Sequence, residues 1–435
     1  GGLVAATTAA QNGAKVVVLE KAGAIAAARE AIGALNSKLA PDHQEDVPTL
    51  LNHANQTQAG DANMLMHKTW AEKSGEMIEW MADTLGPKGM LFPFEWHCPD
   101  DPHAYYPAMC YNPCIGEYNP DGPNYNSYAH LEVMRDVFTE DLGGEIRFEC
   151  PAQQLIIDEA GRVTGVIATA EDGSRTLFNA AKGVIVCTGS YAGNAAMVKK
   201  FQQEKVAKLL EEGNVYTMYM ESDDLSSPEP MDDGIGHRMM CWAGAEMEGG
   251  PHGFLGWPNG GHIGCPNLEV DQAGMRYMNE ALFPVNQVQQ VVSAASMPNG
   301  AFTWEISSTE DRLMPCFIGI DPNVLDAIAK SGTGVYQADT LEELAELIDV
   351  DPAAFTATVE RYNEMCEKGV DEDFMKSPEY LIPVKNPPFY AFNEKWVFVC
   401  SIAGVHTNDK FQVLNADHEV IPGLFAAGNT VGRRF

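Results

Sequence analysis

The residue types at the start of the chain are suited to holding a nucleotide. Gly1 and Gly2 precede an Ala-rich stretch, and Glu20 ends a β-branched apolar run 18 residues after Gly2. Glycines let a backbone approach a pyrophosphate at a helix N-terminus, and an acid at the end of the next strand accepts hydrogen bonds from ribose hydroxyls. This spacing predicts dinucleotide binding. A generic helix–strand unit, in which Gly2 only begins the helix, is the alternative.

Two elements must position these residues. Leu3–Gln11 is typical of a helix, and Asn12 with Gly13 supplies its end. Val16–Leu19 is typical of a strand buried on both faces. A complete fingerprint has a strand and a first glycine before this helix, so we expect the chain to begin inside its own fingerprint.

The rest of the chain alternates between helical and strand patterns. Residues 87–125 are dense in Pro, aromatic residues and Cys, and we expect them to be irregular. Strands are predicted within 145–187 and at 395–400 and 411–415. Helices are predicted over most of 45–85, at about 129–142, from Asp232 to Gly244, and at about 322–330, 340–348 and 352–368.

Composition restricts the classes of partner. A formal net charge of −33 repels the phosphates of nucleic acid and of anionic membranes. No apolar run approaches the roughly 20 residues that a membrane-spanning helix needs. The ten cysteines include no CxxC pair, and we expect no zinc, haem or iron–sulfur site. The compartment, cytoplasmic or exported, stays open because a signal peptide would precede residue 1.

The order of the motifs resembles the fumarate reductase/succinate dehydrogenase flavoprotein superfamily, whose FAD-dependent ene-reductases and dehydrogenases include the 3-ketosteroid dehydrogenases. The resemblance covers nearly the whole chain. The motifs that carry it are GGLVAATTAAQNGAKVVVLEK, GGEIRFECPAQQLIIDEAGRVTGVIA, KGVIVCTGSYAGN, MDDGIG followed by WAGAE, AGMRYMNE at 273–280 and IPGLFAAGN at 421–429.

This resemblance implies an α/β fold. A doubly wound, Rossmann-like FAD-binding domain would comprise residues 1–250 and 386–435, with an α+β capping domain inserted at 251–385, and the flavin would lie between the two domains. In this family a terminal helix closes over the flavin, and it would follow Phe435. We therefore expect a chain that is truncated at both ends.

The resemblance also implies FAD as the cofactor. The flavin would be held without a covalent bond, because no His that could carry it occurs between residues 22 and 42. Two of the implied contacts have a structural alternative, since Gly428 can be only a tight turn and Asp233 only a helix cap. The residues implied to contact FAD are Gly1, Gly2, Glu20, Lys21, Gly33, Ala152, Thr188, Gly189, Asp233, Ala403, Gly404, Gly428 and Asn429.

Departures from the family pattern bear on the substrate. The catalytic Arg of the fumarate reductases falls at Pro284, and Cys400 stands where they carry a substrate-binding His. Between residues 245 and 390 the only arginines are Arg276, Arg312 and Arg361. Because arginine forks are what hold a dicarboxylate, these gaps disfavour fumarate and succinate. Aromatic residues in the same segment favour a flat apolar molecule, although each can equally be core.

We therefore expect a flavin-dependent oxidoreductase acting on CH–CH or C=C bonds. It would reduce or form the activated C=C bond of an apolar or aryl enoate or enone, by hydride transfer at flavin N5. A positioned acid must deliver the proton, and the candidates are His262, Tyr277 and His406 in that order. The alternative is that His262 is a loop histidine whose ring nitrogens are hydrogen-bonded and which takes no part in the reaction.

Only one dinucleotide fingerprint is visible, which favours a separate electron donor or acceptor. A quinone, a haem protein or a flavin-bearing partner would serve. Two other functions stay open. The chain can be a flavin-binding electron-transfer protein without C=C chemistry, or a true fumarate reductase in which another residue replaces the lost acid.

Overall fold

The chain forms two compact units. The first comprises residues 1–194, 222–252 and 401–435, and the second comprises residues 195–221 and 253–400. The expected division, with an insertion at 251–385, stays a prediction. The computed structural model describes residues 1–25, 32–57, 63–97, 108–116, 129–169, 173–202, 204, 206–207, 215–217, 232–259, 267–281, 303–308 and 334–433.

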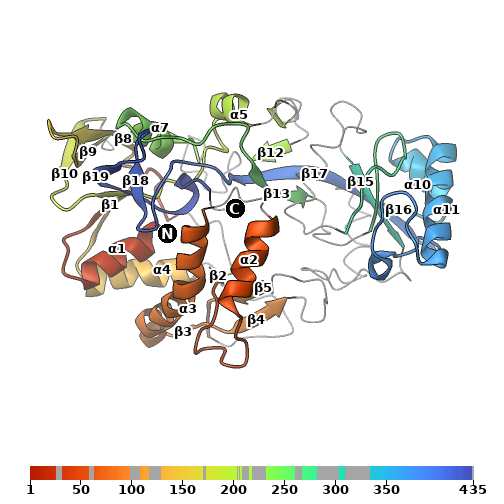
Figure 1. Ribbon diagram of the computed structural model, residues 1–435, viewed down its shortest axis with the longest axis horizontal. Helices are drawn as coiled ribbons and strands as arrows, with labels where there is room; N and C mark the ends of the chain where they lie inside the picture. Colours follow the sequence, from red (N-terminus) through yellow and green to blue (C-terminus); the bar gives the residue numbers. More distant parts are fainter. Residues whose placement is uncertain are drawn as a thin grey trace. The chain divides into compact units, whose positions relative to one another are not determined.

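The first unit begins with the helix and strand that the sequence predicts. Helix α1 (Gly2–Gln11) ends at Asn12, whose side-chain amide donates to the carbonyl of Thr8, and Gly13 then adopts a φ of +76°. A left-handed residue of this kind ends a helix, and glycine adopts it without steric cost. The other helices of this unit are α2 (Val47–Thr57), α3 (Met64–Leu85), α4 (Ala129–Asp136) and α7 (Ile235–Trp242) (Figure 1).

Parallel pairing organises the strands near α1. β1 (Val17–Leu19) pairs in parallel with β7 (Glu145–Arg147), and β11 (Val184–Val186) pairs in parallel with β19 (Val420–Ala426). β18 (Gln412–Leu414) adds to β19 as an antiparallel strand. Because the carboxyl ends of parallel strands meet at one edge, the residues after β11 and β19 lie together. The antiparallel sheet β10–β9–β8 contains β8 (Ala152–Ile157), β9 (Val163–Thr169) and β10 (Arg175–Asn179).

Short strands occur in the described parts of the stretch expected to be irregular, residues 87–97 and 108–116, so the prediction is wrong for those strands. Tyr111 and Cys114 are almost fully buried, and Tyr111 packs in one cluster with Met90 and residues of α3 and α4. Apolar contact with these helices explains the burial, which a Pro-rich pattern without strict alternation does not reveal. The strands of this stretch are β3 (Met90–Leu91), β4 (Phe94–His97), β5 (Ala108–Tyr111) and β6 (Cys114–Ile115). β3 pairs with β6, and β5 pairs with β4 and with β2 (Ile32–Gly33), which comes from an earlier part of the chain.

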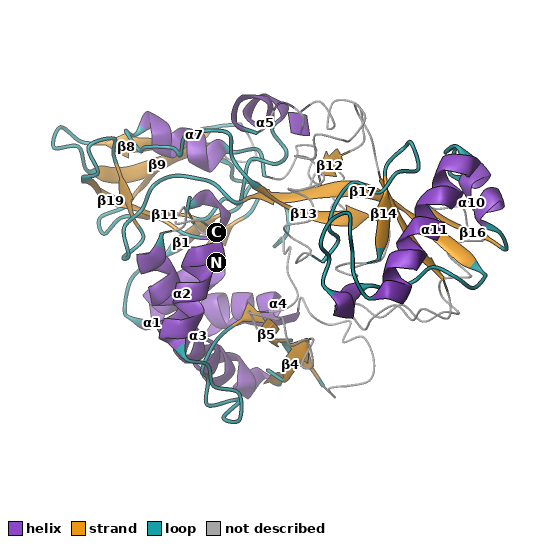
Figure 2. Cartoon of the chain, turned by 45° about the vertical axis from the view of Figure 1, so that its right-hand side comes forward, coloured by secondary structure: helices purple, strands orange, loops and turns teal. Residues whose placement is uncertain are grey.

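The second unit is a sheet with two helices beside it. Strand β17 (Phe389–Ser401) is central, because β12 (Val215–Thr217), β13 (Phe254–Asn259), β15 (Thr303–Ser308) and β16 (Val335–Ala338) all pair with it, and β14 (Leu268–Val270) pairs with β15. Helices α10 (Leu341–Leu347) and α11 (Pro352–Lys368) lie side by side next to β16 (Figure 2). This unit also contains α5 (Ala195–Phe201). The helix predicted at 322–330 lies outside the described residues.

The predicted helices at 340–348 and 352–368 are confirmed, and their ends follow from their sequences. The side chain of Thr340 accepts a hydrogen bond from the N–H of Glu343, and that of Asp351 accepts one from Ala354, so each helix has an N-cap. Gly369 ends α11 with a φ of +67°. Phe355 and Val359 of α11 pack on β14 and β15 in one apolar core.

A buried ion-pair network fixes the loop after β14. The guanidinium of Arg276 forms paired hydrogen bonds with Glu280, at 2.8 Å each, and with Asp371, at 3.0 and 2.7 Å. Lys376 Nζ lies 3.1 Å from Glu280 Oε2. Although burial acts to raise it, the pKa of Asp371 is held below its usual range by Arg276 and by backbone N–H groups. Such paired forks are among the strongest polar contacts in proteins.

A second buried carboxyl, on Glu269, forms no ion pair among the described residues and is stabilised differently. Glu269 stands opposite Glu305 in the β14–β15 pairing, and Tyr277 donates to its Oε2 at 2.6 Å. Burial raises the pKa of Glu269 to about 7, and the nearby charge of Glu305 adds to the effect. The folded protein therefore retains a proton on Glu269 that the unfolded chain releases above about pH 4.5.

The raised pKa of Glu269 predicts a pH-dependent loss of stability. Because the folded pKa exceeds the unfolded one, this contribution is complete below about pH 4.5 and is lost by about pH 7, a change of about 2–3 kcal/mol. Urea unfolding of Glu269→Gln should therefore show a smaller fall in stability between these pH values than the unsubstituted protein. Glu342→Gln, on the exposed side of α10, is the control and should leave the pH profile unchanged. Identical profiles for Glu269→Gln and the unsubstituted protein would contradict this account.

Candidate functional site

The amino-terminal end of α1 lies at the carboxyl end of β11. A Cβ atom placed on Gly2 would be 3.5 Å from Cβ of Cys187, the residue after β11. Among the described residues, no side chain caps the start of α1, and its first turn contains no acid. The free N–H groups of a helix start attract anions, so this end of α1 suits a pyrophosphate. That is the role the sequence predicts for Gly1 and Gly2.

Glu20 follows β1 at the same end of the parallel strands. Its backbone N–H donates to the carbonyl of Arg147 at 2.9 Å, which continues the β1–β7 pairing by one residue. Burial raises the pKa of Glu20, while the backbone N–H groups of Ala22 and Lys21 act to lower it. Oε1 accepts from Ala22 at 2.9 Å. The carboxyl is thus fixed in place where a ribose acceptor is expected.

Lys21 and Asp233 are brought together from distant parts of the sequence. Lys21 Nζ lies 3.2 Å from Asp233 Oδ2 in a half-buried ion pair. Asp233 Oδ1 also accepts a hydrogen bond from the N–H of Ile235, the first residue of α7, at 2.8 Å. Asp233 thus holds the start of α7 from the position before its N-cap, Gly234, and a contact with FAD would be an additional role.

Gly189 occupies a position that only glycine fits. It has a φ of +80°, and a Cβ placed on it would collide with Oδ1 of Asp232. Asp232 itself has a φ of +54°, and its Oδ2 accepts a hydrogen bond from Ser190 Oγ at 2.8 Å. Burial raises the pKa of Asp232. The sequence predicts a role for Asp233 but not for Asp232, and the place of Asp232 within the MDDGIG motif was the available signal.

Thr188 faces α7 through a second close approach. A Cβ placed on Gly236 would collide with Oγ1 of Thr188 and would lie 2.9 Å from a methyl carbon of Val186. The missing side chain at Gly236 lets α7 lie directly against the turn after β11. The Thr188 side chain therefore packs on α7, and its predicted phosphate contact would come through the backbone.

Glu248 holds the segment that contains Ala403 and Gly404, and sequence reasoning missed it. Its Oε2 accepts from the N–H of Gly404 at 2.8 Å, and its Oε1 accepts from the N–H of Arg433 at 3.0 Å. Its own N–H donates to the carbonyl of Gly404 at 3.1 Å. A Cβ placed on Gly404 would collide with the carbonyl of Thr430. The acid just after the WAGAE motif was the only sequence signal for this residue.

Gly428 and Asn429 form the turn after β19. The N–H of Ala427 donates to the carbonyl of Val186 at 3.0 Å, which places this turn beside the one after β11. Gly428 has a φ of +72°, and no neighbouring atom lies within 4 Å of a Cβ placed on it. Its conformation thus requires a tight turn, with open space beside it. Gly33 pairs with Cys110 between β2 and β5, and Ala152 begins β8 opposite Ala168, so both belong to other sheets.

The three proton-donor candidates fall in different parts of the chain. His262 lies outside the described residues. Tyr277 is buried in the second unit, where its hydroxyl donates to Glu269. His406 is in the first unit, with Nδ1 2.9 Å from Glu246 Oε2.

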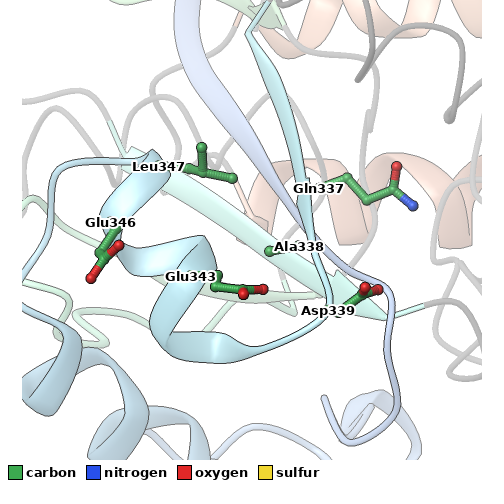
Figure 3. Close-up of a pocket in the computed structure, with 6 residues that line it drawn as sticks. All are labelled: Gln337, Ala338, Asp339, Glu343, Glu346 and Leu347. Atoms are coloured by element: carbon green, nitrogen blue, oxygen red, sulfur yellow. The ribbon is translucent and has the colours of Figure 1, made fainter.

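A surface pocket in the second unit includes none of the predicted site residues. It has a volume of about 750 Å³ and lies between the end of β16 and α10 (Figure 3). Its carboxylates come from Asp339, Glu343 and Glu346. This acidic lining suits neither a carboxylate nor the phosphates of a nucleotide.

Comparison with known proteins identifies a family and several relatives of this chain. The sequence model of a family described as "FAD binding domain" matches residues 1–435. The NADH:acrylate oxidoreductase of Vibrio harveyi is 28% identical over 305 residues, which are 67% of this chain and 28% of that protein. The digoxin reductase of Eggerthella lenta is 26% identical over 480 aligned residues, covering 99% of this chain and 80% of that protein. This chain thus spans little more than a quarter of the acrylate oxidoreductase.

The fold is also found among solved structures. The 3-ketosteroid-Δ4-(5α)-dehydrogenase of Rhodococcus jostii RHA1, in complex with 4-androstene-3,17-dione, superposes with a TM-score of 0.71. The two sequences are 20% identical, and the match covers 99% of this chain and 88% of that one. This likeness confirms the coarse fold prediction, a fold of helices and sheets shared with flavoenzymes.

The packing at Gly189 predicts an unequal response of two glycines with the same backbone conformation. Gly161 has a φ of +78° with no atom within 4 Å of an added Cβ, so Gly161→Ala should cost only the left-handed strain, about 1–2 kcal/mol. Gly189→Ala must also displace Asp232 from Ser190 and should cost about 1–3 kcal/mol more. Urea unfolding of both variants measures the difference. Equal losses of stability would show that the Asp232 contact is unimportant.

Proposed function

Because this chain belongs to the family of FAD-binding domains, we propose that it forms the flavin-binding part of an oxidoreductase acting on C=C bonds. The protein would reduce, or form, the activated C=C bond of an apolar or aryl enoate or enone. The observation that carries this proposal is the family match over residues 1–435. Within that range, the KGVIVCTGSYAGN and IPGLFAAGN motifs contain the paired strands β11 and β19.

The residues at that edge fit FAD. The start of α1 offers backbone N–H donors, and open space lies beside Gly1 and Gly428. Glu20 supplies a fixed, buried carboxyl for the ribose. We infer that the cofactor is held without a covalent bond, since no His occurs between residues 22 and 42. When bound, FAD supplies hydride transfer at N5 of its flavin ring.

The finer domain arrangement is part of the proposal. Residues 1–250 and 386–435 would form the doubly wound cofactor domain, and residues 251–385 would form the α+β cap. Parallel pairing of β1 with β7 and of β11 with β19 supports the cofactor domain. The sheet centred on β17, with α10 and α11 beside it, supports a separate α+β body.

The arginines support an apolar or aryl substrate over a dicarboxylate. Arg276 uses its fork on Glu280 and Asp371 and is almost fully buried. Arg361 pairs with Asp373. Arg312 lies outside the described residues. The names of the two relatives, which refer to acrylate and digoxin, and the androstenedione bound in the steroid dehydrogenase agree with an enoate or enone.

We place His262 first among the proton donors. Tyr277 would have to leave its hydrogen bond with Glu269, and His406 faces a carboxylate in the first unit. The electrons would pass to or from a separate partner, namely a quinone, a haem protein or a flavin-bearing protein. No helix in the described part of the chain is long and apolar enough to cross a membrane.

Acceptor specificity is the first test. The FAD-loaded protein, reduced anaerobically with viologen, should be reoxidised by cinnamate-type acids or a 3-ketosteroid enone and much more slowly by fumarate. The reason is that Arg276 and Arg361, the described arginines between residues 245 and 390, are paired with carboxylates. The flavin absorbance reports the rate, and urocanate completes the panel. Rapid reoxidation by fumarate would overturn the substrate argument. Reoxidation by an electron-transfer partner but by no alkene would favour an electron carrier.

Substitution of the proposed proton donor is the second test. His262→Ala should lower turnover by more than about tenfold, because protonation by a positioned acid contributes at least that much. The flavin content of the purified variant should stay unchanged, which separates the chemistry from cofactor binding. Turnover equal to that of the unsubstituted protein would remove His262 from the mechanism.

A further inference from the structure

Three potential metal ligands from distant parts of the sequence converge in the first unit. Glu246 lies just after α7, His406 lies between β17 and β18, and His418 lies in the turn between β18 and β19. One ligand atom from each residue lies within 4.8 Å of the other two. The group is outside the turns assigned to FAD after β11 and β19. Because 160 residues separate Glu246 from His406, no spacing rule could reveal it, and the sequence predicts no metal site.

Backbone hydrogen bonds hold the three segments in register. The N–H of His406 donates to the carbonyl of Glu246 at 2.9 Å, and the N–H of Glu246 donates to the carbonyl of Leu414 at 3.0 Å. The N–H of Leu414 in turn donates to the carbonyl of His406 at 3.0 Å. His418 is fixed in its turn by a bond from its N–H to the carbonyl of Asn415 at 2.9 Å. The positions of the three residues are therefore set by the fold.

The side chains present their ligand atoms to one point. Nδ1 of His406 and Nδ1 of His418 lie 2.9 and 4.0 Å from the same oxygen, Glu246 Oε2. The two rings are nearly parallel, at 6°, with centroids 6.2 Å apart. Ligand atoms about 2.1 Å from a tetrahedral zinc ion lie about 3.4 Å from one another. The two distances in the structure lie on either side of that value.

The Glu246 oxygen that both imidazoles approach lacks a hydrogen-bond donor in the described part of the chain. Glu246 Oε2 is buried and, among the described residues, takes part in no hydrogen bond of acceptable geometry. Leaving a buried charged oxygen unsatisfied is costly, and a cation between it and the imidazole nitrogens would remove that cost. The His418 side chain is 72% exposed, so it can move the small distance that ligation requires.

We propose that Glu246, His406 and His418 bind one divalent transition-metal ion, of which Zn²⁺ is the example. Two imidazoles and one carboxylate suit this class of ion, whereas Mg²⁺ and Ca²⁺ prefer oxygen ligands throughout. Three protein ligands leave a further coordination position for water. The ion would join Glu246, which follows α7, to His418 in the β18–β19 turn, and so stabilise the first unit.

Calorimetric titration with zinc chloride tests the site directly. The FAD-loaded protein, freed of metal with a chelator, should bind one ion per chain, and His418→Ala and Glu246→Gln should each weaken binding by about tenfold or more. His43→Ala removes an exposed histidine elsewhere in the first unit and should leave binding unchanged. Zinc should also raise the melting temperature of the unsubstituted protein more than that of His418→Ala, because a ligand that binds only the folded state stabilises it in proportion to its binding free energy.

Two results would overturn the proposal. One is that zinc does not bind, or binds at a stoichiometry other than one ion per chain. The other is zinc binding that His418→Ala and Glu246→Gln leave unchanged, which would place the ion elsewhere. Magnesium chloride is the control ion and should produce neither heat of binding nor a shift in melting temperature. None of these readouts depends on turnover, so they are independent of the proposed reaction.

Discussion

Close backbone packing at the carboxyl ends of β11 and β19 is the constraint on which the rest of the candidate site depends. Two turns meet there, and the start of α1 and the start of α7 approach them. Side chains are excluded at Gly189, Gly236 and Gly404, because a Cβ at each would collide with a neighbouring residue. Short side chains bring backbone N–H groups to the surface of this edge. A large anionic cofactor needs such an edge because backbone donors can surround it without added charge.

Acidic side chains then hold this backbone in place. Glu20, Asp233 and Glu248 each accept hydrogen bonds from main-chain N–H groups of neighbouring turns. Asp232 accepts a hydrogen bond from the side-chain hydroxyl of Ser190. The acidic residues behind the strongly negative net charge therefore fall into two groups with different roles. Most acids can be solvated surface, whereas these few are buried or half-buried and determine the shape of the cofactor edge. Charge-assisted bonds to N–H groups are strong enough to justify that burial.

The sequence predicts the parts of the fold that depend on local pattern. The family, the cofactor, α1, β1, α10 and α11 are confirmed, because glycine spacing, capping residues and apolar periodicity carry them. It fails where pairing is non-local. The strands from β3 to β6 are short and hidden in a Pro-rich stretch, and Glu248 becomes recognisable only once Gly404 and Arg433 lie beside it. The cluster of Glu246 with two histidines is non-local in the same sense. The roles given to the individual FAD and proton-donor residues stay predictions.

The second unit neutralises its buried acids in two ways, and the difference bears on its chemistry. Glu280 and Asp371 face Arg276, so their charges are balanced by a cation. Glu269 is balanced by a proton and by the hydroxyl of Tyr277. While Glu269 keeps its proton, Tyr277 donates to a neutral acceptor; once the proton leaves, the same bond becomes charge-assisted and stronger. Rising pH would then hold the Tyr277 proton more firmly in the core. Tyr277 is therefore better suited to fixing β14 than to delivering a proton, which is why we place it behind His262 among the proposed acids.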